Sequence, residues 1–186
     1  MLLTKSSIKT LLGIALCSAM AVVLLWYLQR QSDFNRVVKL LPAIKVAASE
    51  SSVDPYLLAG LVYAESRGQA DALSSGNASG SCQLLPTTAA EVAGKMQISG
   101  PPYSPQDNLR MGAFYLAQMI RQNNDDTVLG LLSYRLGATR VKRNIAKHGG
   151  VEEYLASMRG RPKTPLSYVE QIIEHQQKFS QHDQTL

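Results

Sequence analysis

The sequence predicts an all-α domain that follows a single transmembrane helix at the N-terminus. An apolar stretch without any charged residue runs from Thr10 to Leu28. After it, apolar residues recur every three or four positions in one segment after another, which is the spacing of amphipathic helices. No alternating run of convincing length indicates a β-strand. One helical domain is therefore the expected architecture.

The apolar stretch is long enough to be a membrane anchor. At the rise of an α-helix, Thr10–Leu28 covers most of the roughly 30 Å hydrocarbon core of a bilayer. Trp26 and Tyr27 lie at its edge, where amphipathic rings favour the membrane interface. A cleaved signal peptide is the alternative, because Ala19-Met20-Ala21 has the small residues of a cleavage site. Cleavage there would leave an apolar new terminus, so residues 1–31 are predicted to stay as a signal-anchor.

Composition limits the classes of partner. The formal net charge is +5 over 186 residues, which favours polyanionic surroundings. Five Lys and Arg but no acid lie between Arg135 and Lys147, either as a solvated helix face or as a surface for an anionic polymer or lipid. No nucleic-acid motif accompanies them, so no nucleic-acid partner is expected. Cys17 lies in the apolar stretch and Cys82 in the domain, so no disulfide is predicted.

The helical segments suggest where the domain begins and ends. Residues 32–52 form a predicted juxtamembrane helical segment, which Pro42 is expected to interrupt. Residues 53–179 form the predicted domain, and residues 180–186 form a loose polar tail. After a first helix before Gly68, the expected helices of the domain are 86–96, 105–122, 127–137, 140–147, 151–158 and 168–179.

Glu65 is a carboxylate on the apolar face of a short predicted helix. Leu57 and Leu61 precede it at intervals of four residues, so the three side chains share one face. Asp54-Pro55 is an N-cap followed by a proline at the first helical position, and Gly68 is a stop signal. We therefore expect Glu65 in the last turn, facing inward.

This position should raise the pKa of Glu65. Burial and the negative end of the helix dipole both disfavour the charged carboxylate, which suits a proton donor. The alternative is an ordinary last-turn glutamate that pairs with Arg67 or turns out to water.

Four motifs in order along the chain resemble those of a known family. Glu65-Ser66 is followed by Ser74–Pro86, which is similar to the stretch Ser-Pro-x-Gly-Ala-x-Gly-Leu-Met-Gln-x-Met-Pro. Pro105–Leu116 is similar to an Asn-Ile-x-x-Gly-x-x-Tyr-Leu helix, Leu131–Gly137 to Ala-Tyr-Asn-Ala-Gly, and Tyr168-Val169 to a late Tyr-Val pair. On these motifs the chain resembles the soluble-type (family 1) lytic transglycosylases, relatives of goose-type lysozyme. The resemblance covers most of the domain.

The resemblance implies a goose-lysozyme-like helical fold with a cleft for glycan strands. It also implies cleavage of the β-1,4 bond between N-acetylmuramic acid and N-acetylglucosamine without water, which leaves a 1,6-anhydro ring. Glu65 would be the single acid and base: it protonates the glycosidic oxygen and then removes the proton of the muramoyl C6 hydroxyl. No second acid belongs to the pattern, and Asp71 is interpreted as a solvated loop residue.

The same resemblance assigns residues to substrate binding. Ser74 would help to orient the N-acetyl group, and Gln83 would line the glycan cleft. Tyr134 would hydrogen-bond near the catalytic carboxyl and hold it in place. Ser66, next to the acid, and Arg135 complete the predicted substrate-binding set.

Three positions depart from the family pattern. Ser81-Cys82 replaces Leu-Met, which makes that wall of the sugar subsite smaller. Arg135 replaces an Asn beside the cleft, and two roles are open to it: binding a carboxylate of a peptide stem, or lowering the pKa of Glu65. Leu136 and Ala138-Thr139 change the turn after the Tyr-Asn position.

The sequence therefore predicts a peptidoglycan lytic transglycosylase without metal or cofactor, held in the inner membrane with its domain in the periplasm. The histidines show no metal-site spacing. A lysozyme-type hydrolase is a second hypothesis, and a non-catalytic peptidoglycan-binding or scaffold module is a third. Because the chain is small and anchored, service to a secretion or conjugation apparatus is a further hypothesis.

Overall fold

The structure is a computed structural model that describes residues 5–185, with side chains from residue 14 onward. Its helices are α1 (Lys5–Ser51), α2 (Pro55–Ser66), α3 (Pro86–Met96), α4 (Pro105–Arg121), α5 (Thr127–Leu136), α6 (Ala138–His148), α7 (Val151–Ala156) and α8 (Pro165–Gln184). Two isolated β-bridges occur in the loop after α2, but the described residues form no strand. The all-α prediction is confirmed. The chain divides into two compact units, the first ending at Asn35 and the second beginning at Arg36.

In the first unit, α1 exposes apolar side chains in every direction. They are Ile14, Leu16, Met20, Val22, Val23, Leu24, Leu25, Trp26, Tyr27 and Leu28. The hydroxyl of Ser18 donates a hydrogen bond to the Ile14 carbonyl at 2.8 Å, so it needs no water partner. By length and composition this helix can cross a membrane. Residues 1–4 of the predicted anchor lie outside the described residues.

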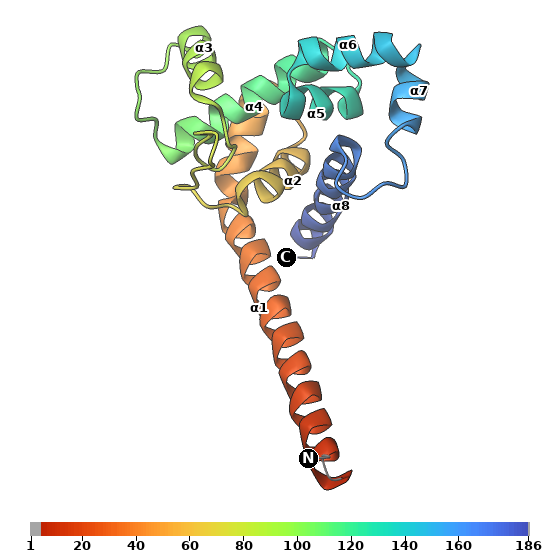
Figure 1. The fold of residues 1–186 in the computed structure, drawn as a ribbon. Helices are drawn as coiled ribbons and strands as arrows, with labels where there is room; N and C mark the ends of the chain where they lie inside the picture. The colour runs from red at the N-terminus through yellow and green to blue at the C-terminus, as the bar shows by residue number, and fades with distance from the viewer. Residues whose placement is uncertain (1–4, 186) are drawn as a thin grey trace. The chain divides into compact units, whose positions relative to one another are not determined.

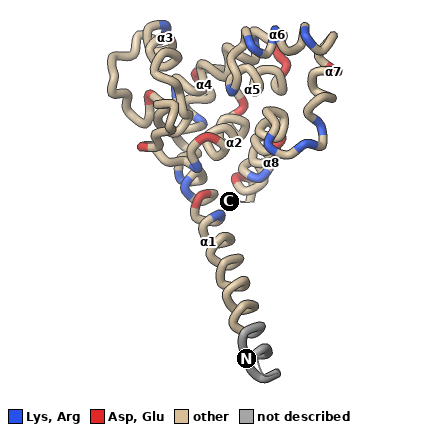
Figure 2. Tube along the Cα trace, viewed as in Figure 1, with Lys and Arg blue, Asp and Glu red and all other residues tan. Residues whose placement is uncertain are grey.

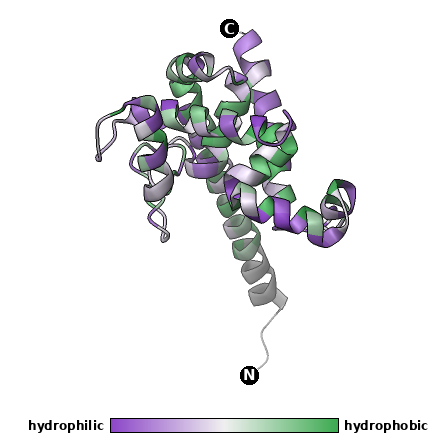
Figure 3. Cartoon of the chain, turned by 90° about the horizontal axis from the view of Figure 1, so that it is seen from above, coloured by the Kyte–Doolittle hydropathy of each residue, from purple (hydrophilic) through white to green (hydrophobic). Residues whose placement is uncertain are grey.

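The second unit is built on two helix pairs. Helix α2 packs against α8, and α4 packs against α5 (Figure 1). Every residue from Leu57 to Tyr63 is buried, so α2 is enclosed by its neighbours. In Figure 3, helices of this unit carry both hydrophobic and hydrophilic residues, as expected of amphipathic helices around one core.

The second half of α1 contributes to the core of the second unit. Val37, Leu41 and Ile44 are buried at helical spacing. The expectation that Pro42 interrupts this helix is wrong. Pro42 lies on the exposed side, and buried residues before and after it hold the helix in place.

The C-terminal residues are also part of the folded unit. Helix α8 continues to Gln184, and Asp183 accepts hydrogen bonds from Lys45 Nζ and the Tyr56 hydroxyl, both at 2.7 Å. The expectation of a loose tail from Ser180 is therefore wrong for residues 180–184, because α8 is tied to α1 and α2. We propose that the domain extends from Arg36 to Gln184 in place of residues 53–179.

Gly60 allows α2 and α8 to approach each other closely. A Cβ atom at Gly60 would lie 2.5 Å from the backbone oxygen of Ile172 and 3.2 Å from its Cγ2. Backbone atoms within a helix cannot move aside at low cost, so a side chain at this position would push the helices apart. The close approach is what brings the start of α8 to the end of α2.

Gly60→Ala is expected to lower the free energy of unfolding by about 1–3 kcal/mol, the usual cost of overpacking a core. Gly94→Ala, in α3, is the matched control, because nothing lies within 4 Å of a Cβ there. It should raise the free energy of unfolding by about 0.5–1 kcal/mol through better helix propensity. Urea denaturation of the detergent-solubilised chain, followed by circular dichroism, compares the two. Stabilisation by both changes would contradict the packing described.

Candidate active site

Helix α2 carries Glu65 at its end. The Oδ1 atom of Asp54 accepts a hydrogen bond from the backbone N–H of Leu57 at 2.7 Å, and Pro55 takes the first helical position. The helix stops where Arg67 adopts a left-handed conformation, with φ of 57°. The predicted N-cap and first-turn proline are confirmed, and Glu65 lies in the last turn.

Side chains from two other helices enclose the carboxyl group of Glu65. Only 10% of the Glu65 side chain is exposed, and Oε2 lies 3.7 Å from Nη1 of Arg135 on α5. Oε1 accepts a hydrogen bond from the hydroxyl of Tyr168 on α8 at 2.6 Å. Arg67 instead donates to the carbonyl of Tyr63 at 3.2 Å and lies over its ring. The acid therefore faces inward, and the alternative pair of Glu65 with Arg67 is not formed.

Burial is the strongest influence on the protonation of Glu65. It raises the pKa above the ordinary value of 4.5. The hydrogen bond from Tyr168 and the charge of Arg135 both lower the pKa, but they do not outweigh burial. Burial also raises the pKa of Tyr168, so its hydroxyl stays a donor. Glu65 thus keeps its proton to a higher pH than an exposed glutamate, as a proton donor requires.

Glu65 lines a cleft of about 380 Å³. The predicted site residues in its lining are Glu65, Ser74, Gln83, Tyr134 and Arg135. Apolar and aromatic neighbours in the lining include Leu84, Leu85, Tyr115 and Leu136. These residues come from α2, the loop between α2 and α3, α4 and α5, so segments far apart in the sequence meet here.

The loop between α2 and α3 (residues 67–85) positions two of these residues by its own hydrogen bonds. Ser74 Oγ accepts a hydrogen bond from the N–H of Ala78 at 3.0 Å. Gln83 Nε2 donates to the carbonyl oxygens of Ala72 and Gly80, both at 3.0 Å. The Ser74 hydroxyl can still donate its hydrogen, and the Gln83 amide oxygen can still accept, so both can serve a ligand in the cleft.

Ser66 lies outside the lining of this cleft. It is buried, its hydroxyl donates to the Ser81 carbonyl at 2.8 Å, and its oxygen accepts from the N–H of Gly68 at 3.1 Å. Since both capacities are used within the protein, the structure does not support the substrate contact predicted for Ser66. The side chain instead ties the end of α2 to the following loop.

The sequence of this domain matches the model of a known protein family. The transglycosylase SLT domain matches residues 42–156, which is more than half of the chain. The chain belongs to the transglycosylase SLT domain family. The predicted family is thereby confirmed.

Solved structures of lytic transglycosylases share the fold of the SLT domain. Lytic transglycosylase Slt from Pseudomonas aeruginosa, solved as an inactive mutant, is 24% identical with a TM-score of 0.66 over 76% of this chain and 24% of that chain. The 70 kDa soluble lytic transglycosylase SLT70 from Escherichia coli is 20% identical with a TM-score of 0.64, over 74% of this chain and 23% of that chain. The 70-kDa soluble lytic transglycosylase in complex with bulgecin A is 19% identical with a TM-score of 0.66, over 77% of this chain and 24% of that chain. This chain thus spans about a quarter of those enzymes, and the lysozyme-like fold is confirmed.

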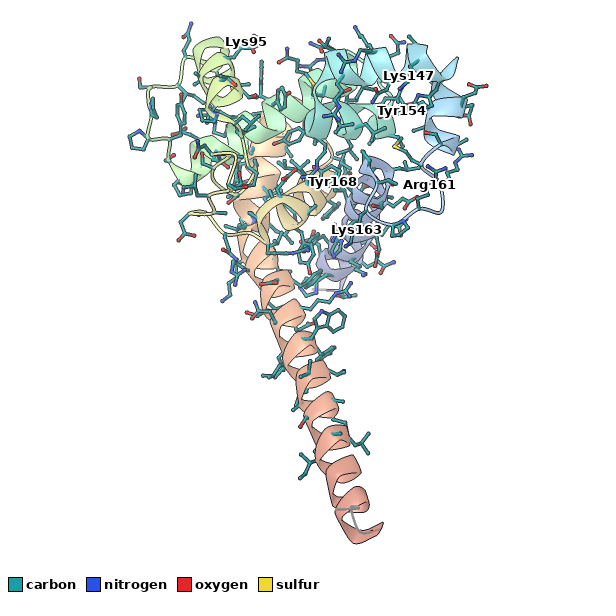
Figure 4. All side chains as sticks on the ribbon, viewed as in Figure 1. Lys95, Lys147, Tyr154, Arg161, Lys163 and Tyr168 are labelled. Atoms are coloured by element: carbon teal, nitrogen blue, oxygen red, sulfur yellow. The ribbon has the colours of Figure 1, made fainter. Side chains whose placement is uncertain are left out.

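In the SLT domain of this chain, Tyr168 rather than Tyr134 bonds the acid. The Tyr134 hydroxyl donates to the carbonyl of Cys82 at 2.8 Å, and its ring lies 5.0 Å from that of Tyr115. Tyr168, at the start of α8, is labelled in Figure 4. Sequence reasoning marked it only as part of a Tyr-Val pair. The separation of 103 residues from Glu65 hid its role, because the contact depends on how α8 packs on α2.

Arg135 is the one Lys or Arg in the described lining of the cleft. Its Cζ lies 4.8 Å from the centre of the Tyr168 ring. The remaining cations of the basic segment, Arg140, Lys142, Arg143 and Lys147, lie on α6 (Figure 2). They are exposed and form no ion pair with the described residues, as in a solvated helix face.

Asn108 on α4 supports the loop from its far side. Its Nδ2 donates to the Ser79 carbonyl at 3.1 Å, and its Oδ1 accepts from the N–H of Cys82 at 2.9 Å. A Cβ atom at Gly112 would overlap the Cys82 sulfur, so α4 passes directly over the thiol. Burial raises the pKa of Cys82, which keeps the thiol neutral. The sequence marks Asn108 only as part of the Pro105–Leu116 motif, and its contact with the loop was not predicted, although it shares a helix face with Gly112.

Among the residues that the structure describes, no second Asp or Glu lines this cleft. Asp71 lines a separate groove of about 560 Å³ together with Leu73 and Pro101. Among the described residues, no three His, Cys, Asp or Glu side chains gather as a metal-binding group.

The raised pKa of Glu65 predicts a pH-dependent stability. The folded state binds this proton more tightly than the unfolded state, so the free energy of unfolding falls as pH rises from 4.5 through the folded pKa. Glu65→Gln cannot ionise and escapes this loss. Its melting temperature should exceed that of wild type by more at pH 7 than at pH 4, and Glu152→Gln controls for the loss of one exposed charge. A gain that is larger at pH 4 would contradict the raised pKa.

Proposed function

We propose that this chain is a peptidoglycan lytic transglycosylase in which Glu65 acts first as acid and then as base. One observation carries the proposal: Glu65 is the one Asp or Glu among the described residues that line the cleft. Glycosidases that use water generally need a second carboxylate, about 5–9.5 Å from the first, as nucleophile or base. With a single carboxylate, the nucleophile is supplied by the substrate.

In the proposed reaction Glu65 first donates a proton and then takes one back. Protonated Glu65 donates its proton to the glycosidic oxygen as the bond from that oxygen to C1 of N-acetylmuramic acid breaks. The resulting carboxylate takes the proton of the C6 hydroxyl while the C6 oxygen bonds to C1. The products are a free 4-hydroxyl on N-acetylglucosamine and a 1,6-anhydro ring, no water is consumed, and Glu65 regains its proton.

The surroundings of Glu65 fit both halves of this cycle. Burial favours the protonated form that begins the reaction, whereas Tyr168 and Arg135 favour the carboxylate formed midway. Because these influences oppose each other, neither form is strongly trapped. We assign Ser74 and Gln83 to the glycan, since each keeps a hydrogen-bonding atom available at the cleft.

A relative of known structure supports the assignment of a glutamate as the acid. The P. aeruginosa relative was solved as an inactive mutant with Gln in place of Glu, as expected where a glutamate is catalytic.

We further propose that α1 anchors the protein in the inner membrane with the domain in the periplasm, where peptidoglycan lies. Its exposed and mostly apolar residues 14–28 suit lipid. Service to a secretion or conjugation apparatus stays a prediction.

Glu65→Gln is expected to reduce the release of 1,6-anhydro-muropeptides from purified sacculi by about 10²–10⁴-fold, the usual contribution of a general acid or base. The detergent-solubilised variant should keep the circular dichroism spectrum of wild type. Mass spectrometry of the products separates two further readings. Products heavier by one water would indicate a hydrolase, and binding of wild type without any solubilisation would indicate a non-catalytic module.

Tyr168→Phe tests which tyrosine serves the acid. It removes a hydrogen bond that lowers the pKa of Glu65, so this pKa should rise. Because the reaction starts from protonated Glu65, the alkaline limb of the pH–rate profile should move to higher pH. Tyr134→Phe is the matched control: its hydroxyl bonds the Cys82 carbonyl, so it should lower the melting temperature without moving that limb. A shift with Tyr134→Phe alone would reverse the two assignments.

A further inference from the structure

Arg135 has unused hydrogen-bonding capacity at the cleft. Its side chain is 50% exposed, and its Nη1 is 3.7 Å from Glu65 Oε2, farther than the roughly 2.7–2.9 Å of a charge-assisted hydrogen bond. In the described part of the chain the guanidinium makes no hydrogen bond. Five N–H groups in a planar fork are thus available beside the acid.

The Tyr168 ring gives this cation a fixed support. The Arg135 Cζ lies 4.8 Å from the ring centre, while the hydroxyl of the same tyrosine bonds Glu65 at 2.6 Å. One aromatic side chain therefore positions both the acid and the cation. A cation–π contact fixes the guanidinium over the ring but leaves its N–H groups free to turn toward a ligand.

The chemistry of the fork indicates its ligand. A planar guanidinium matches a carboxylate in a bidentate pair. The sugar rings of peptidoglycan are uncharged, whereas its peptide stems carry carboxylates. Resting on the proposed function, we propose that Arg135 forms a subsite that binds a carboxylate of the peptide stem, and that this carboxylate offsets the effect of the cation on Glu65.

This exchange would couple substrate recognition to the acid. The groups that act on Glu65 are Tyr168 on α8 and Arg135 on α5, and the neutral Cys82 and Tyr134 lie close enough to sense its charge. Arg135 is the charged group among them. When a substrate carboxylate neutralises it, the pKa of Glu65 rises and the acid is loaded with its proton. Arg135 would then play both roles that the sequence leaves open, one after the other: it lowers the pKa of Glu65 before substrate binds, and it binds the stem carboxylate afterwards.

Three substrates test whether a carboxylate is recognised and whether it belongs to the peptide stem or to the lactyl group. The first is intact sacculi, the second is sacculi whose carboxylates are converted to neutral amides, and the third is strands stripped of peptides by an amidase, which leaves a lactyl carboxylate. Wild type should have a kcat/KM about tenfold higher on intact sacculi than on either modified substrate, since a hydrogen bond to a charged group contributes about that factor. A preference for stripped over amidated strands would place the lactyl group, rather than the stem, in the subsite.

Variants of Arg135 show whether this residue is responsible. Arg135→Gln should raise KM on intact sacculi and remove the preference, whereas Arg135→Lys should keep part of it. Arg140→Gln is the matched control, because it removes the same charge from an exposed position outside the cleft lining and should keep the wild-type preference. The alkaline limb of the wild-type pH–rate profile should also lie at higher pH on intact than on amidated sacculi. For Arg135→Gln, this limb should lie at the same pH on both substrates.

A binding measurement tests the subsite independently of turnover. In a Glu65→Gln background, a muramoyl disaccharide with its peptide stem should bind about tenfold more tightly than its amidated form, and Arg135→Gln should abolish the difference. Equal binding and equal turnover of both forms by proteins that retain Arg135 would overturn the subsite and leave the proposed function standing. If wild type showed no turnover but the stem-bearing disaccharide still bound more tightly than its amidated form, the proposed function alone would be overturned.

Discussion

The hydrogen bond between Tyr168 and Glu65 is the interaction on which the site depends. It joins the start of α8 to the end of α2 at 2.6 Å and holds the carboxyl group against the cleft wall. The ring of the same tyrosine supports Arg135, so one side chain positions both the acid and the cation. The bond exists because Gly60 lets the two helices meet at backbone distance. A packing constraint inside the core thus fixes the geometry of the proposed chemistry.

The part of the cleft lining that comes from the loop is built differently. The loop of residues 67–85 has no regular structure, yet its backbone groups are bonded within the loop and to Asn108 on α4. Buried polar groups without partners would be costly, so these bonds make one loop conformation favourable. The loop therefore presents Ser74 and Gln83 from a fixed frame. The acid and the loop residues assigned to the glycan thus both lie on parts of the fold that are held by hydrogen bonds.

Much of this arrangement is predictable from the sequence, and the failures have physical reasons. The position of Glu65 follows from local rules, namely an N-cap, a proline and an interval of four residues. Tyr168 could not be found in that way, because its contact with Glu65 depends on long-range helix packing. The structure does not support the substrate contact predicted for Ser66, because a residue adjacent in sequence lies on a different face of the helix from the acid. Pro42 was misjudged because tertiary packing of α1 outweighed its local preference.

The central claim is that burial keeps a proton on Glu65 above the pH at which an exposed glutamate loses it. Direct titration of the Glu65 carboxyl carbon by NMR tests it, in the detergent-solubilised chain with labelled glutamate and with Glu65→Gln to assign the signal. The account predicts a pKa above 4.5. A pKa at or below 4.5 would contradict it, because the carboxyl group would then be a poor proton donor near neutral pH.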